Sequence, residues 1–181
     1  SFVTTISITF ILLIYALIKM NIYSDILSLF RRGIFILVSG HTTTGVQNIY
    51  TQQFILDWGF PAMLAVIIAM AIGASACSTG GGFKGLRMGI IFKGFIHEIR
   101  RIVLPENASF STKYHHVKDM ILTDQTVKIA AMIVLAYIGL YFAGAMLGVT
   151  HGYLFINSLF DSVSAGSNTG LSCGVTAASM P

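Results

Sequence analysis

The sequence predicts an all-α integral membrane protein that combines full-length membrane helices with shorter helices entering the bilayer without crossing it. Three observations support this fold class. Of the 181 residues, 55% are hydrophobic and only 10% are charged, whereas about a quarter of the residues of a soluble domain carry charge. The apolar residues gather in long runs separated by polar stretches. One shorter apolar run also recurs later in the chain, together with the polar residues that follow it.

The first apolar segment, Phe2–Ile18, is nearly uninterrupted. About 20 such residues span the hydrocarbon core of a bilayer, so we predict a membrane-spanning helix. The next segment, Ile26–Val38, would be about 20 Å long as a helix, which is too short to cross. We expect it to be a re-entrant helix that begins after Asp25 as its N-cap.

A third apolar segment, Phe60–Phe95, is interrupted by glycine. The stretch Gly73–Gly89 contains six of the 18 glycines of the chain, and each glycine inside a helix costs up to about 1 kcal/mol relative to alanine. We therefore predict a membrane helix that is broken midway by Gly73–Gly82, here called the glycine loop.

The second half of the chain repeats the beginning of this order. The segment Ile102–Gln125 is polar and predicts a solvent-exposed linker, Val127–Val149 predicts a second full span, and His151–Ser164 predicts a second short helix.

The predicted organisation has three parts. Residues 1–101 form a complete unit of helix, short helix, loop and broken helix, residues 102–125 form a cytoplasmic linker, and residues 126–181 form the same unit without its final helix. A start at Ser1 and an abrupt end at Pro181 suggest a piece of a longer protein.

The basic residues indicate the orientation in the membrane. Positive side chains gather on the cytoplasmic side of membrane proteins, and most of those that flank the predicted spans do so at one end: Lys93, Arg100, Arg101, Lys113 and Lys118. Both short helices then enter from outside, although Arg31 and Arg32 argue against this orientation. We expect a multi-pass protein of the plasma membrane, in contact with lipid. The net charge of +4 is not gathered on one face, so nucleic acid is not an expected partner.

The two short helices are related by an internal sequence repeat. Leu29–Val46 recurs 125 residues later as Leu154–Leu171, with seven identical positions. Each copy ends in hydroxyl side chains and a glycine. These endings are the first loop, Thr42-Thr43-Thr44-Gly45, and the second loop, Ser167-Asn168-Thr169-Gly170.

The two loops favour a cation site. Irregular backbone at membrane depth is tolerated only where it is buried in protein or lines water, and backbone carbonyls can replace the water shell of a cation. The preceding helices would direct the negative ends of their dipoles at the same place. Neither loop contains an acidic residue. The alternative is that Thr and Gly only end two buried helices, and the duplication in matching context argues against it.

The glycine loop is a candidate gate beneath this site. Small residues allow it to move without steric cost, and the hydroxyls of Ser75, Ser78 and Thr79 can face water. Its candidate gating glycines are Gly73, Gly80, Gly81 and Gly82. Lys84 and Arg87 follow, either as membrane anchors or as gating residues. A close helix contact through small residues is the alternative for this loop.

Three motifs carry a family resemblance: SGHTTTG, GASACSTGGGFKGLR and SAGSNTGLS. Together they resemble the Trk/Ktr/HKT superfamily of potassium transporters, whose members have four tandem membrane-helix/pore-helix/membrane-helix repeats with re-entrant filter loops, like potassium channels. The chain matches the third repeat and the start of the fourth. The resemblance implies that both loops are filter segments, that Gly45 and Gly170 occupy the selectivity positions, and that the glycine loop gates conduction.

The resemblance also implies partners and cargo. Potassium is the transported ion and no organic cofactor is expected. The partners would be the remaining repeats of the same pore, a second copy in a homodimer, and a cytosolic nucleotide-binding regulatory subunit. The basic residue that the family carries in its last membrane helix is absent from these residues.

Two other functions share some of these sequence features. A secondary cation transporter also uses broken helices, but usually with ionisable residues at the midplane. An intramembrane hydrolase would need a nucleophile elbow, and G-A-S-A-C departs from that spacing at Cys77, so we expect no enzyme. Cys77 and Cys173 predict neither a disulfide nor a metal site. His41 is predicted to be a loop residue near the inner vestibule, and Asp161 a packing or interface residue.

Overall fold

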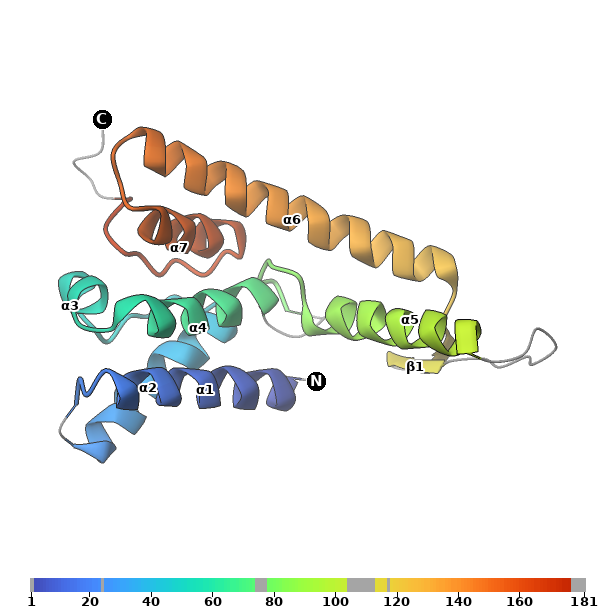
Figure 1. Cartoon of the computed structure of the whole chain (residues 1–181), viewed down its shortest axis with the longest axis horizontal. Coiled ribbons are helices and arrows are strands. Elements are labelled where there is room, and N and C mark those ends of the chain that lie inside the picture. The colour runs from blue at the N-terminus through green and yellow to red at the C-terminus, as the bar shows by residue number, and fades with distance from the viewer. Residues whose placement is uncertain (1, 24, 74–77, 104–112, 117, 177–181) are drawn as a thin grey trace.

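The computed structural model describes residues 2–23, 25–73, 78–103, 113–116 and 118–176. Within this part of the chain the helical character predicted from the sequence is confirmed (Figure 1). The helices are α1 (Phe2–Lys19), α2 (Ile26–His41), α3 (Thr51–Leu56), α4 (Gly59–Ile72), α5 (Gly85–Val103), α6 (Asp124–Thr150) and α7 (Phe155–Gly166). The short helix α3 was not expected from the sequence.

The main core lies where α1, α2, α4 and α7 meet. Helix α4 occupies its centre and packs against the other three, which is why its apolar residues are not confined to one face. Trp58 is fully buried in this core, where its indole N–H donates to the Tyr23 hydroxyl at 3.0 Å.

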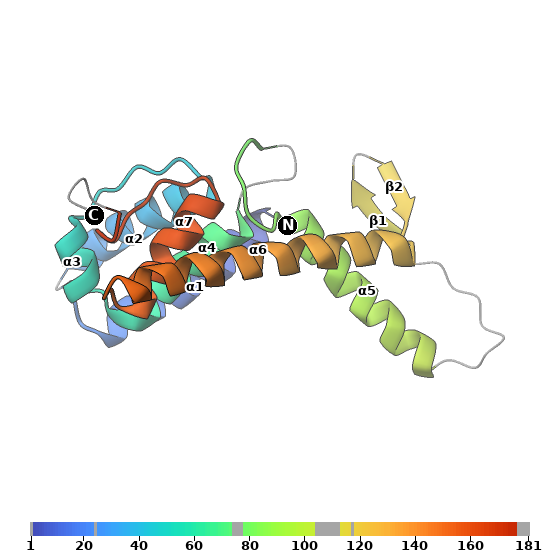
Figure 2. The ribbon, with the colours of Figure 1, turned by 90° about the horizontal axis from the view of Figure 1, so that it is seen from above.

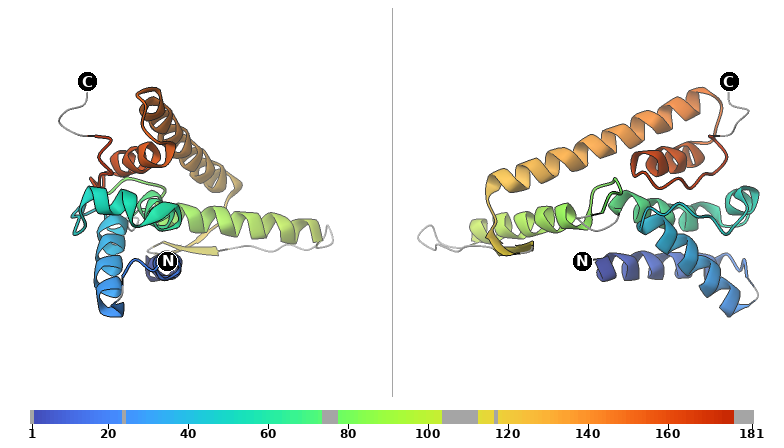
Figure 3. Two further views of the ribbon diagram at one scale, coloured as in Figure 1. Left: turned by 60° about the vertical axis from the view of Figure 1, so that its left-hand side comes forward. Right: turned by 180° about the vertical axis from the view of Figure 1, so that it is seen from behind.

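Helices α2 and α7 are both shorter than a membrane is thick. They contain 16 and 12 residues, which corresponds to about 24 Å and 18 Å against a hydrocarbon core of about 30 Å. Helix α2 begins at the predicted N-cap, because the Asp25 carboxylate accepts the Leu27 N–H at 3.2 Å. It crosses α1 at a steep angle, as both views of Figure 3 show.

The break between α4 and α5 lies where the glycines predicted it. Helix α4 ends at Gly73, whose φ of 68° is accessible at little cost only to glycine. Helix α5 then extends away from the main core and packs against the first turns of α6 (Figures 1 and 2).

Helix α6 is the longest element, with 27 residues and a length of about 40 Å. Among the described residues it is the helix that is long and apolar enough to cross a membrane by itself, whereas α1 and α4 are shorter apolar helices. Helix α7 folds back along α6 and inserts between it and α4.

The predicted linker contains secondary structure that the sequence analysis did not include. The strands β1 (Lys113–His116) and β2 (Lys118–Ile121) form an antiparallel hairpin in which Lys113 pairs with Ile121. Helix α5 also extends into the predicted linker as far as Val103, and α6 begins inside it, capped by the hydroxyl of Thr123. The division into three parts stays a prediction.

Candidate functional site

The first and second loops adopt the same backbone conformation. Thr43 and Asn168 hold matching positions and both have left-handed dihedrals, with φ of 56° and 59°. Two residues later, Gly45 and Gly170 also have positive φ, at 76° and 90°. Non-glycine residues rarely adopt positive φ, so this shared pattern is a specific likeness between two segments that lie far apart in the sequence.

The hydrogen bonds of the two loops match as well. In each loop the N–H of the first residue donates to the carbonyl four positions earlier at 2.8 Å, and that of the third residue donates to the carbonyl five positions earlier at 2.9 Å. The hydroxyls of the first and third residues lie 2.7 Å apart in both copies. Each loop is therefore tied to the C-terminal end of its helix, where the negative pole of the helix dipole lies.

The two loops touch each other through their backbones. A Cβ atom added to Gly45 would collide with the carbonyl oxygen of Thr169 and would lie 3.5 Å from the Cα of Gly170. Because a side chain at Gly45 has no room, the two segments can approach only with glycine at this position. The structure thus brings Gly45 of the first loop against Thr169 and Gly170 of the second.

The described part of the glycine loop contacts both of these segments. The N–H of Gly81 donates to the carbonyl of Ser167 at 2.8 Å, and Gly80 packs so closely on Thr43 that a Cβ atom there would collide with its side chain. In Figure 2 the chain after α2, the chain after α7 and the chain before α5 project on the same side of the helices.

The glycine loop is also held at its base. Phe83 and Lys84 donate their backbone N–H groups to the carbonyls of Ala71 and Ile72, each at 2.8 Å, so the chain folds back on the end of α4. The Lys84 ammonium donates to the carbonyl of Ser78 at 2.8 Å.

This bond places Lys84 within the loop structure, whereas Arg87 lies in the first turn of α5. Thr79 is exposed. The predicted gate residue Ser75 lies outside the described residues, as does Cys77.

His41 is not a loop residue, so that prediction is wrong. It is the last residue of α2 and is buried. Its Nδ1 lies 3.0 Å from the carbonyl oxygen of Ala69 in α4, and its Nε2 lies 3.0 Å from the hydroxyl of Thr5 in α1. Its partners lie 28 and 36 residues away in the chain, so the local sequence did not reveal them.

Asp161 was predicted to be a packing or interface residue, and the structure also gives it specific hydrogen-bond partners. Its buried carboxylate, on α7, accepts hydrogen bonds from Ser172, Cys173 and Thr176. The sequence signal was that Asp161 is the single charged residue of a short helix expected at membrane depth, because a buried charge needs partners.

The donor atoms at the paired loops are carbonyl and hydroxyl oxygens. Such oxygens can coordinate an alkali cation, and no acidic side chain stands in either loop. In the described part of the chain no group of His, Cys, Asp and Glu side chains is arranged to hold a metal ion. The chemistry of the site is therefore that of neutral oxygen ligands at the ends of two helix dipoles.

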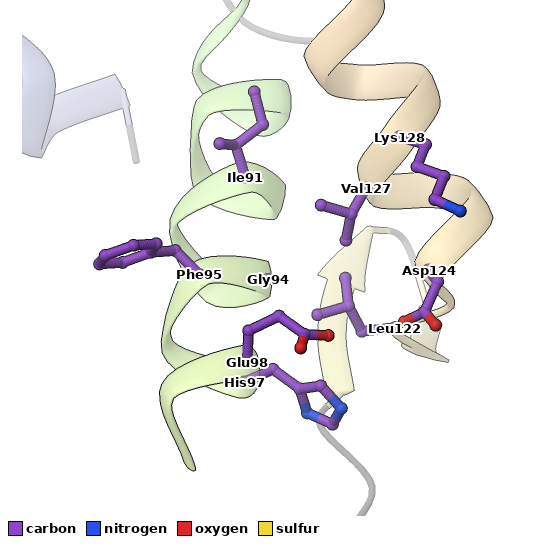
Figure 4. Close-up of a pocket in the computed structure, with 9 residues that line it drawn as sticks. All are labelled: Ile91, Gly94, Phe95, His97, Glu98, Leu122, Asp124, Val127 and Lys128. Carbon is purple, nitrogen blue, oxygen red and sulfur yellow. The ribbon is translucent and has the colours of Figure 1, made fainter. Parts of the chain in front are cut away.

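Two hollows lie away from the paired loops. One, of about 600 Å³, lies between α6, α7 and the chain after the second loop. The other, of about 380 Å³, lies between α5 and the start of α6, with an apolar floor and a charged rim (Figure 4). Its floor includes Ile91, Leu122 and Val127, and its rim includes Glu98, Asp124 and Lys128. Neither hollow includes a residue of the two loops.

Comparison with known proteins identifies the family of the chain. Residues 2–181 match the TrkH family, described as cation transport proteins. The chain belongs to this family. An uncharacterised cation transporter of Methanocaldococcus jannaschii is 31% identical over 172 residues, which are 92% of this chain and 35% of that protein.

Two relatives are named for potassium. The Trk system potassium uptake protein TrkH of Escherichia coli is 36% identical over 93 residues, which are 51% of this chain and 18% of the relative. The Ktr system potassium uptake protein B of Vibrio alginolyticus is 28% identical over 138 residues, or 75% of this chain and 27% of the relative. This TrkH-family chain thus spans about a third or less of the length of these three relatives.

Membership removes one of the two alternative functions that the sequence left open. The family is one of cation transporters and not of enzymes, so the hydrolase alternative is dropped. Together with the apolar span α6, it also identifies the chain as part of a membrane protein of the cell surface.

Proposed function

We propose that this chain supplies two segments of a potassium-selective filter and the loop that gates it. The observation that carries the proposal is the meeting of the first and second loops, which share their dihedrals and hydrogen bonds and touch at Gly45. Two equivalent segments that end short helices and meet backbone to backbone are suited to line one cation path with carbonyl oxygens.

Potassium is the proposed cargo. The loops offer neutral oxygens, which suit a monovalent cation that exchanges its water shell for carbonyl groups. The names of the Escherichia coli and Vibrio alginolyticus relatives point to the same ion. We propose potassium uptake across the plasma membrane as the activity of the whole protein.

The glycine loop is the proposed gate. Its Gly81 N–H donates a hydrogen bond to the carbonyl of Ser167, the first carbonyl of the second loop. The loop approaches its neighbours so closely that a side chain at Gly80 or Gly81 would have no room. A chain this close to both loops obstructs their inner end. Lys84, bonded to Ser78, stabilises the obstructing conformation.

The whole pore needs further partners. Two segments cannot surround an ion, so we propose that the other repeats of the same pore complete the filter. A homodimer and a cytosolic nucleotide-binding subunit remain proposals that rest on the family resemblance.

A secondary cation transporter is the second candidate. The break between α4 and α5 favours it, because broken helices form the binding sites of such transporters. The absence of ionisable side chains from both loops favours the filter.

The filter is tested by Rb⁺ and Na⁺ uptake in cells that carry the full-length protein. Gly45→Ser should abolish most uptake, because its side chain would strike the Thr169 carbonyl. Gly170→Ser should retain uptake but lower the preference for Rb⁺ over Na⁺, since nothing lies within 4 Å of its added Cβ atom and only its φ of 90° is strained. Gly139→Ser, also in open space but on α6, is the matched control. Unchanged selectivity in both loop variants would contradict the proposal.

A further inference from the structure

We propose that Asp161 is the positioning residue that fixes the second loop in its selective geometry. The inference rests on the proposed function and deepens it. Asp161 lies on α7, one and a half turns before the second loop begins, and its side chain is 5% exposed. Burying a carboxylate costs free energy unless several donors hydrogen-bond to it, so the groups that donate to Asp161 indicate its role.

The carboxylate is satisfied entirely by the chain that follows the second loop. Its Oδ1 accepts the N–H of Cys173 at 2.6 Å, and its Oδ2 accepts the N–H and the hydroxyl of Thr176 and the hydroxyl of Ser172, each at 3.0 Å. An ionised carboxylate accepts about four hydrogen bonds, and hydrogen bonds to a charged group are the stronger kind. One side chain therefore holds the exit segment, Leu171–Thr176.

This hold fixes the second loop at both of its ends. At its entrance, Ser167 and Thr169 donate to carbonyls of α7. At its exit, Asp161 attaches the following residues to the same helix. Because both ends are bound to one rigid element, the loop cannot widen or narrow without breaking one set of bonds. Selectivity by carbonyl ligands depends on this geometry.

The first loop is held by different chemistry. The position that corresponds to Asp161 is Ile36, which is buried and apolar. There, the hydroxyl of Ser39 donates to the carbonyl of Val46 just after the loop at 2.7 Å. The corresponding Ser164 hydroxyl is buried without a hydrogen-bond partner in the described part of the chain. The carboxylate has thus replaced the serine as the anchor, which gives the second loop a stiffer support than the first.

Transport by the full-length protein tests the assignment. Asp161→Asn keeps the shape but turns one acceptor into a donor that faces other donors. It should lower the preference for Rb⁺ over Na⁺ by about tenfold, with the same amount of protein in the membrane. Thr176→Val removes one donor and should shift the preference in the same direction by less. Asp57→Asn makes the same chemical change on an exposed residue and should leave selectivity unchanged. Wild-type selectivity in both Asp161→Asn and Thr176→Val would overturn the proposal.

A second measurement reads the position of the exit segment without transport. Cys173 is 2% exposed and bonded to Asp161 through its N–H, so its thiol should react slowly with a methanethiosulfonate reagent in a protein whose other cysteines are replaced. Asp161→Asn should raise this rate several-fold. An unchanged rate would show that Asp161 does not hold the segment.

The two measurements separate this inference from the proposed function. Selectivity that changes in Gly170→Ser but in neither Asp161→Asn nor Thr176→Val would overturn the role of Asp161 alone. A wild-type protein that moves no Rb⁺ would overturn the proposed function, while the reaction rate of Cys173 would still decide whether Asp161 positions the exit segment.

Discussion

At the scale of single residues, His41 joins the end of α2 to both neighbouring membrane helices. A backbone carbonyl can only accept a hydrogen bond, so Nδ1 carries the proton toward Ala69. For the neutral ring, Nε2 then accepts from the hydroxyl of Thr5. These two hydrogen bonds thus fix the position of His41, which directly precedes Thr42, the first residue of the first loop. This role differs from that of Asp161, which acts after its loop.

Removing this ring should destabilise the protein. His41→Ala should cost about 1–3 kcal/mol, because it removes two hydrogen bonds of a buried ring and opens a cavity. Thr5→Val should cost about 1 kcal/mol. The double variant should cost less than the sum, because both changes remove one shared bond. Thermal unfolding of the detergent-solubilised full-length protein measures these effects, with the exposed neighbour Thr4→Val as the control. Additive costs would show that the bond contributes nothing.

At the scale of elements, α4, the glycine loop and α5 form one mechanical unit. The loop is bound at its base through the carbonyls of Ala71 and Ile72, and at its tip through Gly81 and Ser167. Among the described residues the tip is held by one backbone hydrogen bond to the second loop and by tight glycine contacts, whereas the base has two backbone hydrogen bonds and a helix on each side. We expect the tip to detach while the base stays folded.

A methyl group at the tip tests this view. A Cβ atom at Gly81 would lie 2.7 Å from the carbonyl oxygen of Gly166 and 3.0 Å from the carbonyl carbon of Ser167, so Gly81→Ala should push the tip away from the second loop. If the loop obstructs the path, Rb⁺ flux through the full-length protein should increase. Gly89→Ala, on α5 with nothing within 4 Å, should leave flux unchanged. A Gly81→Ala protein with wild-type flux would argue against the gate.

The sequence predicted the elements that apolar length determines, and missed those that depend on distant contacts. The helices α1 and α6 follow from long, nearly uninterrupted apolar runs, α2 and α7 follow from shorter apolar segments, and the break after α4 follows from its glycines. The hairpin β1–β2 was missed because its polar residues lack the alternation of a half-buried strand. Likewise, the pairing of Gly45 with Thr169 was invisible, since only folding brings residues this far apart together.

At the scale of the whole molecule, the candidate site joins the two halves of the chain. The first loop follows α2, the second follows α7, and the glycine loop that contacts both lies between them in sequence. Helix α4 packs against α1, α2 and α7, so the core that stabilises the fold also positions the loops. A cation bound between them would therefore stabilise both halves together.

This arrangement predicts stabilisation by the transported ion. A ligand at 100 times its dissociation constant raises the free energy of unfolding by about 2.7 kcal/mol. K⁺ and Rb⁺ should accordingly raise the unfolding temperature of the purified full-length protein more than Na⁺ or Li⁺ at equal ionic strength. Gly45→Ser should remove the difference between the ions. Equal unfolding temperatures in all four ions for the wild-type protein would count against a selective site.

The bond from Gly81 to Ser167 has a consequence for how the ion acts on the gate. The Ser167 carbonyl oxygen accepts the loop N–H, and a dehydrated cation bound at the same oxygen would draw on the same electron density, so we expect each partner to weaken the other. If closing the loop weakens cation binding at this oxygen by some factor, the bound cation lowers the equilibrium constant for loop closure by the same factor, because the two effects are thermodynamically reciprocal. Under the proposed function, bound potassium therefore shifts the glycine loop toward its open position. The permeant ion helps to displace the loop that blocks its path.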